Sequence, residues 1–440
     1  MSTSLPPSSR ALLVWGVAVV AYVVAVLNRS SLGVAGLETA ARFDVGASLL
    51  ATFAVAQLVV YAGLQIPVGV LLDRLGPRLL IAGGAVLMGA GQLVLAVATE
   101  VPGALLGRVL VGAGDAMTFV SVIRLIPAWF PVRRVPLLTQ VTGAVGQLGQ
   151  ILSAVPLVLV LHGRGWSAAF GSLAVLSLAT ALLVASLVRD SPDDSGRSAR
   201  TWRRRPGGPG ERTADEVLRT RAARAADGGA LRAVVREPGV WLGFWAHFLT
   251  PFSSQVVVLL WGFSFFVEAQ GRTTGEASVL LSVNVVAAIV SGPLLGELAA
   301  RRPGRRTRAV LVIAVAVAVA WVAVLAPPGP RGLGVLVVFS VVVAVGGPAS
   351  LIGFDLARSC VAPARLGTAT GLVNTGGFVA ALTSMLAIGV ALDVLAPAGD
   401  RGIDAYRAAF ALMAVPWVLG VAGVLVSRRR TRAAHPGIAL

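Results

Sequence analysis

Charged residues and cysteine are both scarce in this sequence. Only 13% of the 440 residues are charged, lysine is absent, and the single cysteine is Cys360. Soluble domains carry about 25% charged residues, so this composition excludes an ordinary water-soluble protein. One thiol excludes an intramolecular disulfide framework. No Walker motif, catalytic triad or metal-ligand cluster is recognisable, and we expect neither an enzyme nor a bound metal or cofactor.

Long apolar runs are abundant instead, and 56% of the residues are hydrophobic. The runs are about 20 residues long, which is enough to cross a bilayer core. The first run has no small-residue cleavage site after it, so it predicts a retained span and no signal peptide. The sequence predicts an all-α integral membrane protein with twelve transmembrane helices. Their expected ranges are 11–36, 47–72, 78–98, 102–127, 136–161, 166–188, 238–266, 277–297, 307–326, 332–356, 368–393 and 405–427.

The arginines follow the expected spans in a regular way. A net charge of +17 suits a nucleic-acid partner, but the arginines concentrate in alternate loops, such as 133–134 and 301–308. The opposite loops, around Glu100 and Arg331, are poor in arginine. This asymmetry follows the positive-inside rule. We therefore expect a prokaryotic plasma (inner) membrane protein with both termini in the cytoplasm, and no nucleic-acid partner.

One long polar segment divides the spans into two sets of six. The expected organisation is a first bundle at 1–188, an arginine-rich cytoplasmic linker at 189–237, and a second bundle with a cytoplasmic tail at 238–440. Within the linker, 191–210 is expected to be disordered and 215–236 to form an amphipathic helix at the membrane interface. Either a lipid-headgroup or regulatory contact, or a simple solvated linker, fits this composition.

The most specific motif lies between the second and third expected spans. It begins at Gly69, places Asp73 and Arg74 together, and continues through Gly76 to Arg78. This G-x-x-x-D-R-x-G-x-R pattern resembles the loop between helices two and three of the major facilitator superfamily of transporters. A degraded copy, Gly292-Pro-Leu-Leu-Gly296-Glu297, follows the eighth span. The resemblance implies two six-helix bundles, alternating access, and a gating contact of Asp73 with the start of the eleventh span near Thr368. We expect Arg74 and Arg78 to add charge pairs between the halves.

A second motif lies in the fourth span. Arg108 is followed by Gly112 and Gly114, and this R-x-x-x-G-x-G pattern resembles the same superfamily. The two glycines allow another helix to approach closely. An arginine inside a span costs at least ~2.5 kcal/mol and persists when it faces a cavity or a partner.

Three ionisable residues therefore form a candidate cluster. Arg108 and Asp115 project from one helix face but lie about 10 Å apart along the axis, so they need a third partner. Arg29, inside the first span, is the natural one. The cluster fits an anion site with a titratable acid, or a structural network that holds the first and fourth spans together. Arg124, near the end of the fourth span, is interpreted as a snorkelling side chain.

Other polar side chains within spans are candidates for contact with substrate or protons. They share helix faces or lie near helix centres, although such groups often only bridge helices. His247 could also carry a proton. These candidates are Gln57, Tyr61, Gln147, His247, Asn284 and Asn374.

The residues after Gly114 narrow the family. Gly114-Asp115-Ala116 and Trp129-Phe130-Pro131 resemble the G-E-A and W-F-P patterns of the anion:cation symporter branch. This resemblance implies a secondary active transporter, a symporter, in the lipid bilayer. Our hypothesis is proton-coupled uptake of a small organic anion, and we expect a monomer. Proton-driven efflux of a drug-like or cationic solute is an alternative. A non-transporting membrane sensor on the same fold is another.

Overall fold

The computed structural model describes residues 9–45, 47–192, 231–396 and 402–439. Twelve helices in these ranges are long and apolar enough to cross a membrane, and the described residues contain no strand. The all-α transmembrane prediction is confirmed, and each expected span overlaps an observed one, with ends that differ by at most eight residues. The expected disordered and amphipathic parts of the linker lie outside the described residues, except that 231–236 is helical.

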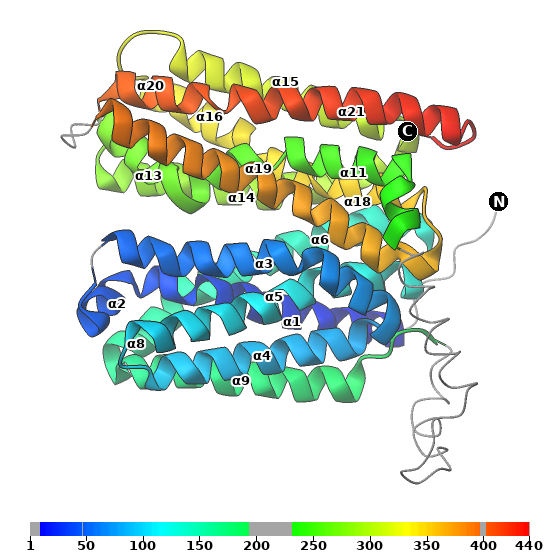
Figure 1. The fold of residues 1–440 in the computed structure, drawn as a ribbon, viewed down its shortest axis with the longest axis horizontal. Helices are drawn as coiled ribbons and strands as arrows, with labels where there is room; N and C mark the ends of the chain where they lie inside the picture. Colours follow the sequence, from blue (N-terminus) through cyan, green and yellow to red (C-terminus); the bar gives the residue numbers. More distant parts are fainter. Residues whose placement is uncertain (1–8, 46, 193–230, 397–401, 440) are drawn as a thin grey trace.

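The first six spans form the lower half of Figure 1. The structure differs from six continuous helices in two places: a short helix follows the first span, and the fifth span is divided into several segments. The elements are α1 (Ser9–Val34), α2 (Gly36–Phe43), α3 (Ala47–Leu75), α4 (Pro77–Val97), α5 (Val101–Trp129), η1 (Val132–Arg134), α6 (Val135–Gly146), α7 (Leu148–Leu152), η2 (Ser153–Leu157), α8 (Val158–Arg164) and α9 (Trp166–Leu187).

The last six spans form the upper half. The elements are α11 (Pro238–Leu249), α12 (Phe252–Val256), η4 (Val257–Trp261), α13 (Gly262–Ser264), η5 (Phe265–Ala269), α14 (Thr274–Arg301), η6 (Pro303–Arg305), α15 (Arg306–Leu325), α16 (Leu333–Ala344), α17 (Gly346–Ala349), α18 (Leu351–Arg358), η7 (Pro363–Arg365), α19 (Leu366–Leu395), α20 (Ile403–Ala411) and α21 (Ala414–Ala434).

Prolines account for several breaks within single spans. Pro156 lies in the π turn of the fifth span, Pro251 separates α11 from α12, and Pro348 lies in the short helix α17. Proline lacks a backbone donor and its ring crowds the preceding turn, which favours a widened turn or a break at these positions. These spans are consequently segmented although the hydropathy along them is continuous.

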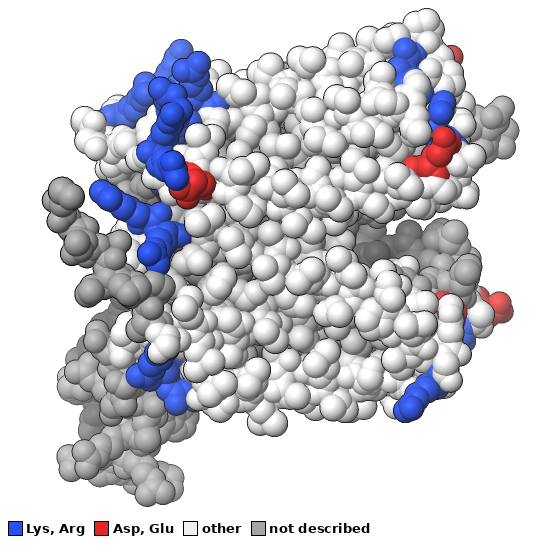
Figure 2. Space-filling model, turned by 180° about the vertical axis from the view of Figure 1, so that it is seen from behind, with Lys and Arg blue, Asp and Glu red and all other residues white. Residues whose placement is uncertain are grey.

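The two halves meet at one end of the molecule. In Figure 1, α3 and α19 converge at the right, and Figure 2 shows that arginines gather at this same end, there on the left. At the opposite end, Figure 2 shows a hollow between the halves. The molecule is therefore closed at its arginine-rich end and open at the other.

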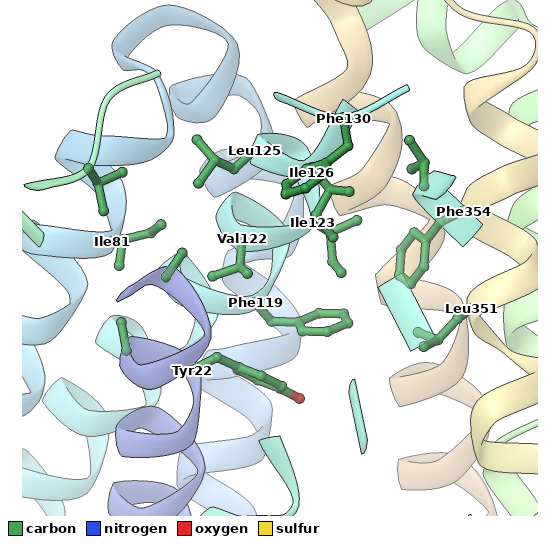
Figure 3. Close-up of a cluster of buried hydrophobic side chains, with 14 of the residues drawn as sticks. Tyr22, Ile81, Phe119, Val122, Ile123, Leu125, Ile126, Phe130, Leu351 and Phe354 are labelled. Atoms are coloured by element: carbon green, nitrogen blue, oxygen red, sulfur yellow. The ribbon is translucent and has the colours of Figure 1, made fainter. Parts of the chain in front are cut away.

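A buried apolar cluster spans the closed end and includes side chains from both halves. Figure 3 shows Phe119, Ile123 and Ile126 of α5 facing Leu351 and Phe354 of α18. The rings of Phe119 and Phe354 lie 6.0 Å apart in an edge-on arrangement, which is favourable for aromatic pairs. Removing these side chains from water stabilises the closed arrangement.

Candidate functional site

A doubly hydrogen-bonded ion pair lies near the middle of the N-terminal half. Arg29 of α1 donates from Nε to Asp115 Oδ2 at 2.6 Å and from Nη2 to Oδ1 at 2.9 Å. The Arg29 side chain is 27% exposed, whereas Asp115 is 1% exposed. Such fork-like pairing fixes both planes and is among the stronger ion-pair geometries. Arg29 is thus the partner of Asp115, as the sequence predicted, and its side chain remains partly exposed.

Arg108 lies beside this pair without an acid of its own. Its Nη2 donates to the backbone oxygen of Arg29 at 3.0 Å and to Oε1 of Gln57, while Nε and Nη1 have no hydrogen-bond partner. The residue is 2% exposed. One arginine is therefore compensated by Asp115 and the second is not, so the cluster carries a net charge of +1 with the acid ionised.

The glycines of the second motif allow helices to approach the cluster. A Cβ on Gly112 would lie 2.7 Å from the backbone oxygen of Gln57, and one on Gly114 would meet Gly84 of α4. A side chain at either position would push α3 or α4 away from α5. This contact holds Gln57 against Arg108.

Tyr61 connects the cluster to the other half. The Arg29 guanidinium lies 5.1 Å from the centre of the Tyr61 ring, a cation–π contact, and the Tyr61 hydroxyl accepts from Asn374 Nδ2 of α19 at 3.3 Å. Phe378, one turn further along α19, packs against the same ring at 4.6 Å. Sequence reasoning missed Phe378, because an apolar residue in a span has no distinguishing signal.

The remaining polar candidates form local contacts. Gln147 accepts from Gln150 at 2.6 Å, His247 contacts the backbone oxygen of Ser350 at 3.0 Å, and Asn284 contacts Ser254 and Ser340 within the C-terminal half. The structure gathers Arg29, Arg108, Asp115, Gln57, Tyr61 and Asn374 around one point. Gln147 and Asn284 have no contact with that group.

The motif acid Asp73 closes the arginine-rich end. Its Oδ1 accepts from the backbone nitrogen of Gly367 at 2.7 Å, and its Oδ2 accepts from the nitrogen of Thr368 at 2.8 Å and from the Thr368 hydroxyl at 2.7 Å. The first amides of a helix have no partner within the helix and carry partial positive charge, so they favour a carboxylate. Gly69 permits this contact, since a Cβ there would lie 2.6 Å from the Gly367 oxygen.

Two arginines differ from the expectations for them. Arg78 was expected to form charge pairs between the halves, but its side chain donates to Ala185 and its backbone nitrogen donates to Asp190 at 2.7 Å, all within the N-terminal half. Arg124, interpreted as a snorkelling side chain, donates to Pro363 of the other half at 3.0 Å. Arg74 lies exposed at the end of α3, and Gly76 follows with φ 80°, a backbone conformation that favours glycine.

The degraded copy of the motif makes a weaker contact between halves. Gly296 packs against α6, where a Cβ would lie 2.9 Å from the Cα of Leu137. Glu297 pairs with Arg301 on its own helix at 2.5 Å and does not reach α6. Gln140 Nε2 instead donates to Pro348 at 2.8 Å. The N-terminal motif therefore makes the stronger closure.

Comparison with known proteins agrees with this geometry. The family model of the Major Facilitator Superfamily matches residues 18–385. The chain belongs to this superfamily. It is accordingly a multi-pass membrane protein of a transporter family and not an enzyme.

Two curated transporters resemble this chain in sequence. A probable sulfoacetate transporter of Cupriavidus necator is 25% identical over 66% of this chain and 65% of its own length. A probable L-galactonate transporter of Escherichia coli is 28% identical over 37% of this chain and 36% of its own. The matches thus span less than two thirds of these relatives.

Two solved superfamily structures share the fold along nearly the whole chain. The proton:xylose symporter XylE bound to 6-bromo-6-deoxy-D-glucose has a TM-score of 0.71 at 17% identity, with 97% of both chains covered. An inward-facing, unoccupied bacterial homolog of the human lysosomal transporter Spinster has a TM-score of 0.56 at 16% identity, covering 96% of this chain and 98% of that one.

Proposed function

We propose that this protein is a secondary active transporter that takes up a small organic anion with a proton by alternating access. The observation that carries the proposal is the partly exposed Arg29, paired with buried Asp115 beside the acid-free Arg108. The two curated relatives support the substrate class, since sulfoacetate and L-galactonate are both organic acids.

The net charge of the cluster favours an anion. Buried ionisable groups in membrane spans are costly and usually functional. Arg108 is nearly inaccessible and has two unpartnered nitrogens, whereas Arg29 is accessible enough to meet a solute. Arg29 would therefore bind the carboxylate or sulfonate directly, and Arg108 would add an attractive charge behind it. The planar guanidinium suits two-point binding of either group.

Proton coupling follows from competition for Arg29. When Asp115 is ionised, both of its carboxylate oxygens accept hydrogen bonds from the Arg29 guanidinium. A proton on Asp115 weakens that pair and leaves Arg29 able to bind the substrate anion. The empty cluster, with Asp115 ionised, has a net charge of +1. A proton on Asp115 adds one positive charge and a bound monoanion adds one negative charge, so the loaded cluster has the same net charge of +1. Loading both together avoids an additional buried charge, which is the physical reason for coupling them.

His247 is the less suitable proton carrier. Its ring contacts Ser350, packs against Phe354 with ring centres 4.9 Å apart, and adjoins Asn374 at the edge of the Arg29 group. This environment is typical of a histidine that positions helices.

The direction of transport depends on which side of the membrane carries the arginines. The positive-inside rule places the arginine-rich end, with both termini, in the cytoplasm of a prokaryotic plasma membrane. The described conformation, closed at that end, would then be outward-facing and ready to load from outside.

Proton-driven efflux of a cationic solute has less support. A cation would need a free carboxylate, and both oxygens of Asp115 already accept from Arg29. A sensor role would rest on the linker, most of which lies outside the described residues.

Uptake into proteoliposomes tests the proposal. Labelled sulfoacetate and L-galactonate serve as probes, with and without an inwardly directed proton gradient. We expect gradient-stimulated uptake of at least one probe, abolished in Arg29→Gln and no longer gradient-dependent in Asp115→Asn. Asp404→Asn is the matched control, because Asp404 pairs with Arg407 at the exposed end of α20. Uptake that survives Arg29→Gln unchanged would remove the anion proposal.

A further inference from the structure

A second constellation of ligating side chains lies at the arginine-rich end, away from Arg29 and Asp115. Glu237 precedes α11, Cys360 lies between α18 and η7, and His435 follows α21. One ligand atom from each, a carboxylate oxygen, the thiol sulfur and an imidazole nitrogen, lies within 4.8 Å of the other two. Sequence reasoning found no metal-ligand cluster, because these residues are far apart in the chain.

We propose that Glu237, Cys360 and His435 bind a divalent metal ion of the zinc class. Zinc accepts sulfur, imidazole nitrogen and carboxylate oxygen at about 2.0–2.3 Å in tetrahedral geometry, which places ligand atoms about 3.3–3.7 Å apart. Small side-chain movements bring the three atoms from their present spacing to that one. The mixed soft and borderline donors favour zinc over magnesium or calcium, which prefer oxygen ligands alone. Three protein ligands leave a fourth position for water.

The charges of the ligands also suit a dication. A carboxylate and a thiolate supply two negative charges and the imidazole is neutral, so the filled site has no net charge. All three residues are partly buried, which limits competition by water yet leaves an entry path. A neutral, half-buried site avoids the cost of an uncompensated buried ion.

The protein already holds the three segments together. His435 Nε2 lies 2.8 Å from Glu237 Oε1, and the same oxygen accepts from the Gly239 nitrogen at 3.1 Å. Gly239 brings α11 directly against the Cys360 sulfur. Beyond the site, the nitrogen of Ile438 donates to His435 and the Ile438 side chain packs against the C-terminal core. The chain tail is thus positioned before any metal arrives.

A metal here would tie three parts of the C-terminal half into one unit. It would fasten the chain tail and the start of α11 to the segment between α18 and α19. That segment also contains Pro363, the acceptor for Arg124, and leads into the Gly367 and Thr368 amides that hold Asp73. The site therefore lies where bound metal stiffens the C-terminal side of the closed end.

Calorimetric titration of the purified full-length protein with zinc chloride, after chelator treatment, tests the site. We expect one zinc per chain. Cys360→Ser and His435→Gln should each weaken binding by at least about tenfold, since losing even a partner outside the coordination shell costs about ten- to a hundredfold. His162→Gln is the matched control, because His162 pairs with Glu38 at 2.9 Å as His435 pairs with Glu237 but has no thiol beside it.

Two measurements on the unsubstituted protein keep the test independent of whether the variants fold. Cobalt(II) bound at the site should give a thiolate-to-metal charge-transfer absorption, and zinc should slow alkylation of the single cysteine. Absence of stoichiometric zinc binding would overturn the proposal. So would equal affinity in Cys360→Ser, or cobalt binding without the thiolate absorption.

Discussion

Asp73 and Thr368 share two hydrogen bonds across the two halves of the molecule, one from the backbone nitrogen at 2.8 Å and one from the hydroxyl at 2.7 Å. Gly367 adds a third bond to the same carboxylate. The acid thus caps a helix of the other half, and opening this end must break all three contacts. The contact joins the two halves and lies apart from the Arg29 cluster.

Asp73→Asn should slow the transport cycle while leaving substrate affinity nearly unchanged. The amide cannot accept at both ends as a carboxylate does, and hydrogen bonds to charged groups contribute about 1.5–3 kcal/mol each. We expect uptake to fall by about tenfold or more, with ligand affinity from thermal-shift titration within about twofold. Glu297→Gln is the control, because the Glu297 side chain pairs with Arg301 of its own helix. A selective loss of affinity in Asp73→Asn would contradict the gating role.

Gly371→Ala should prevent full closure of the arginine-rich end. Its added Cβ would collide with the backbone oxygen of Gln65, and backbone cannot yield as a flexible side chain does. We expect uptake to fall by at least about tenfold, the effect of some 1.4 kcal/mol. Gly63→Ala on α3, where a Cβ meets nothing within 4 Å, should keep wild-type uptake. Equal uptake in both variants would show that the close approach of α3 and α19 is not required.

Arg29→Gln should destabilise the protein more than the double variant Arg29→Gln with Asp115→Asn. The single change leaves a carboxylate that is 1% exposed without its cation, and breaking such a pair costs about 3 kcal/mol. Removing both charges avoids that cost. Thermal unfolding in detergent should therefore show partial recovery in the double variant, whereas uptake should stay lost. Additive destabilisation would indicate that the two residues act independently.

Cys360 should react slowly with iodoacetamide at neutral pH in metal-free protein. Burial, with a smaller contribution from the negative charge of Glu237, raises the pKa of this thiol from 9.0 to about 11. Only the thiolate reacts, so the alkylation rate should keep rising steeply with pH from about 10 to about 11, where a thiol with a pKa of 9.0 is already almost fully ionised. The single cysteine makes mass spectrometry of the intact chain sufficient. Glu237→Gln should shift the profile to lower pH, and an unshifted profile would remove the contribution of Glu237.

The local sequence was sufficient for the spans and for the contact of Asp73 with the start of α19. A run of apolar residues long enough to cross a bilayer must satisfy its backbone internally, so helices follow from composition alone. The motif from Gly69 to Arg78 located this contact, because the close approach at Gly69 and the acid at Asp73 are needed at a fixed spacing. The sequence also predicted a candidate functional cluster of Arg29, Arg108 and Asp115, because a charged residue inside a span is costly and is kept only for a purpose.

Only the tertiary structure showed which side chains contact one another. Periodicity places a side chain on a helix face but not opposite a particular neighbour. Arg78 bonds within its own half, Arg124 crosses to Pro363, and the Tyr61 ring packs on Phe378, and none of these follows from hydropathy. Glu237, Cys360 and His435 come together for the same reason. Their approach depends on how α11, α18 and α21 pack, and that packing is set by side-chain shape along whole helices rather than by any local pattern.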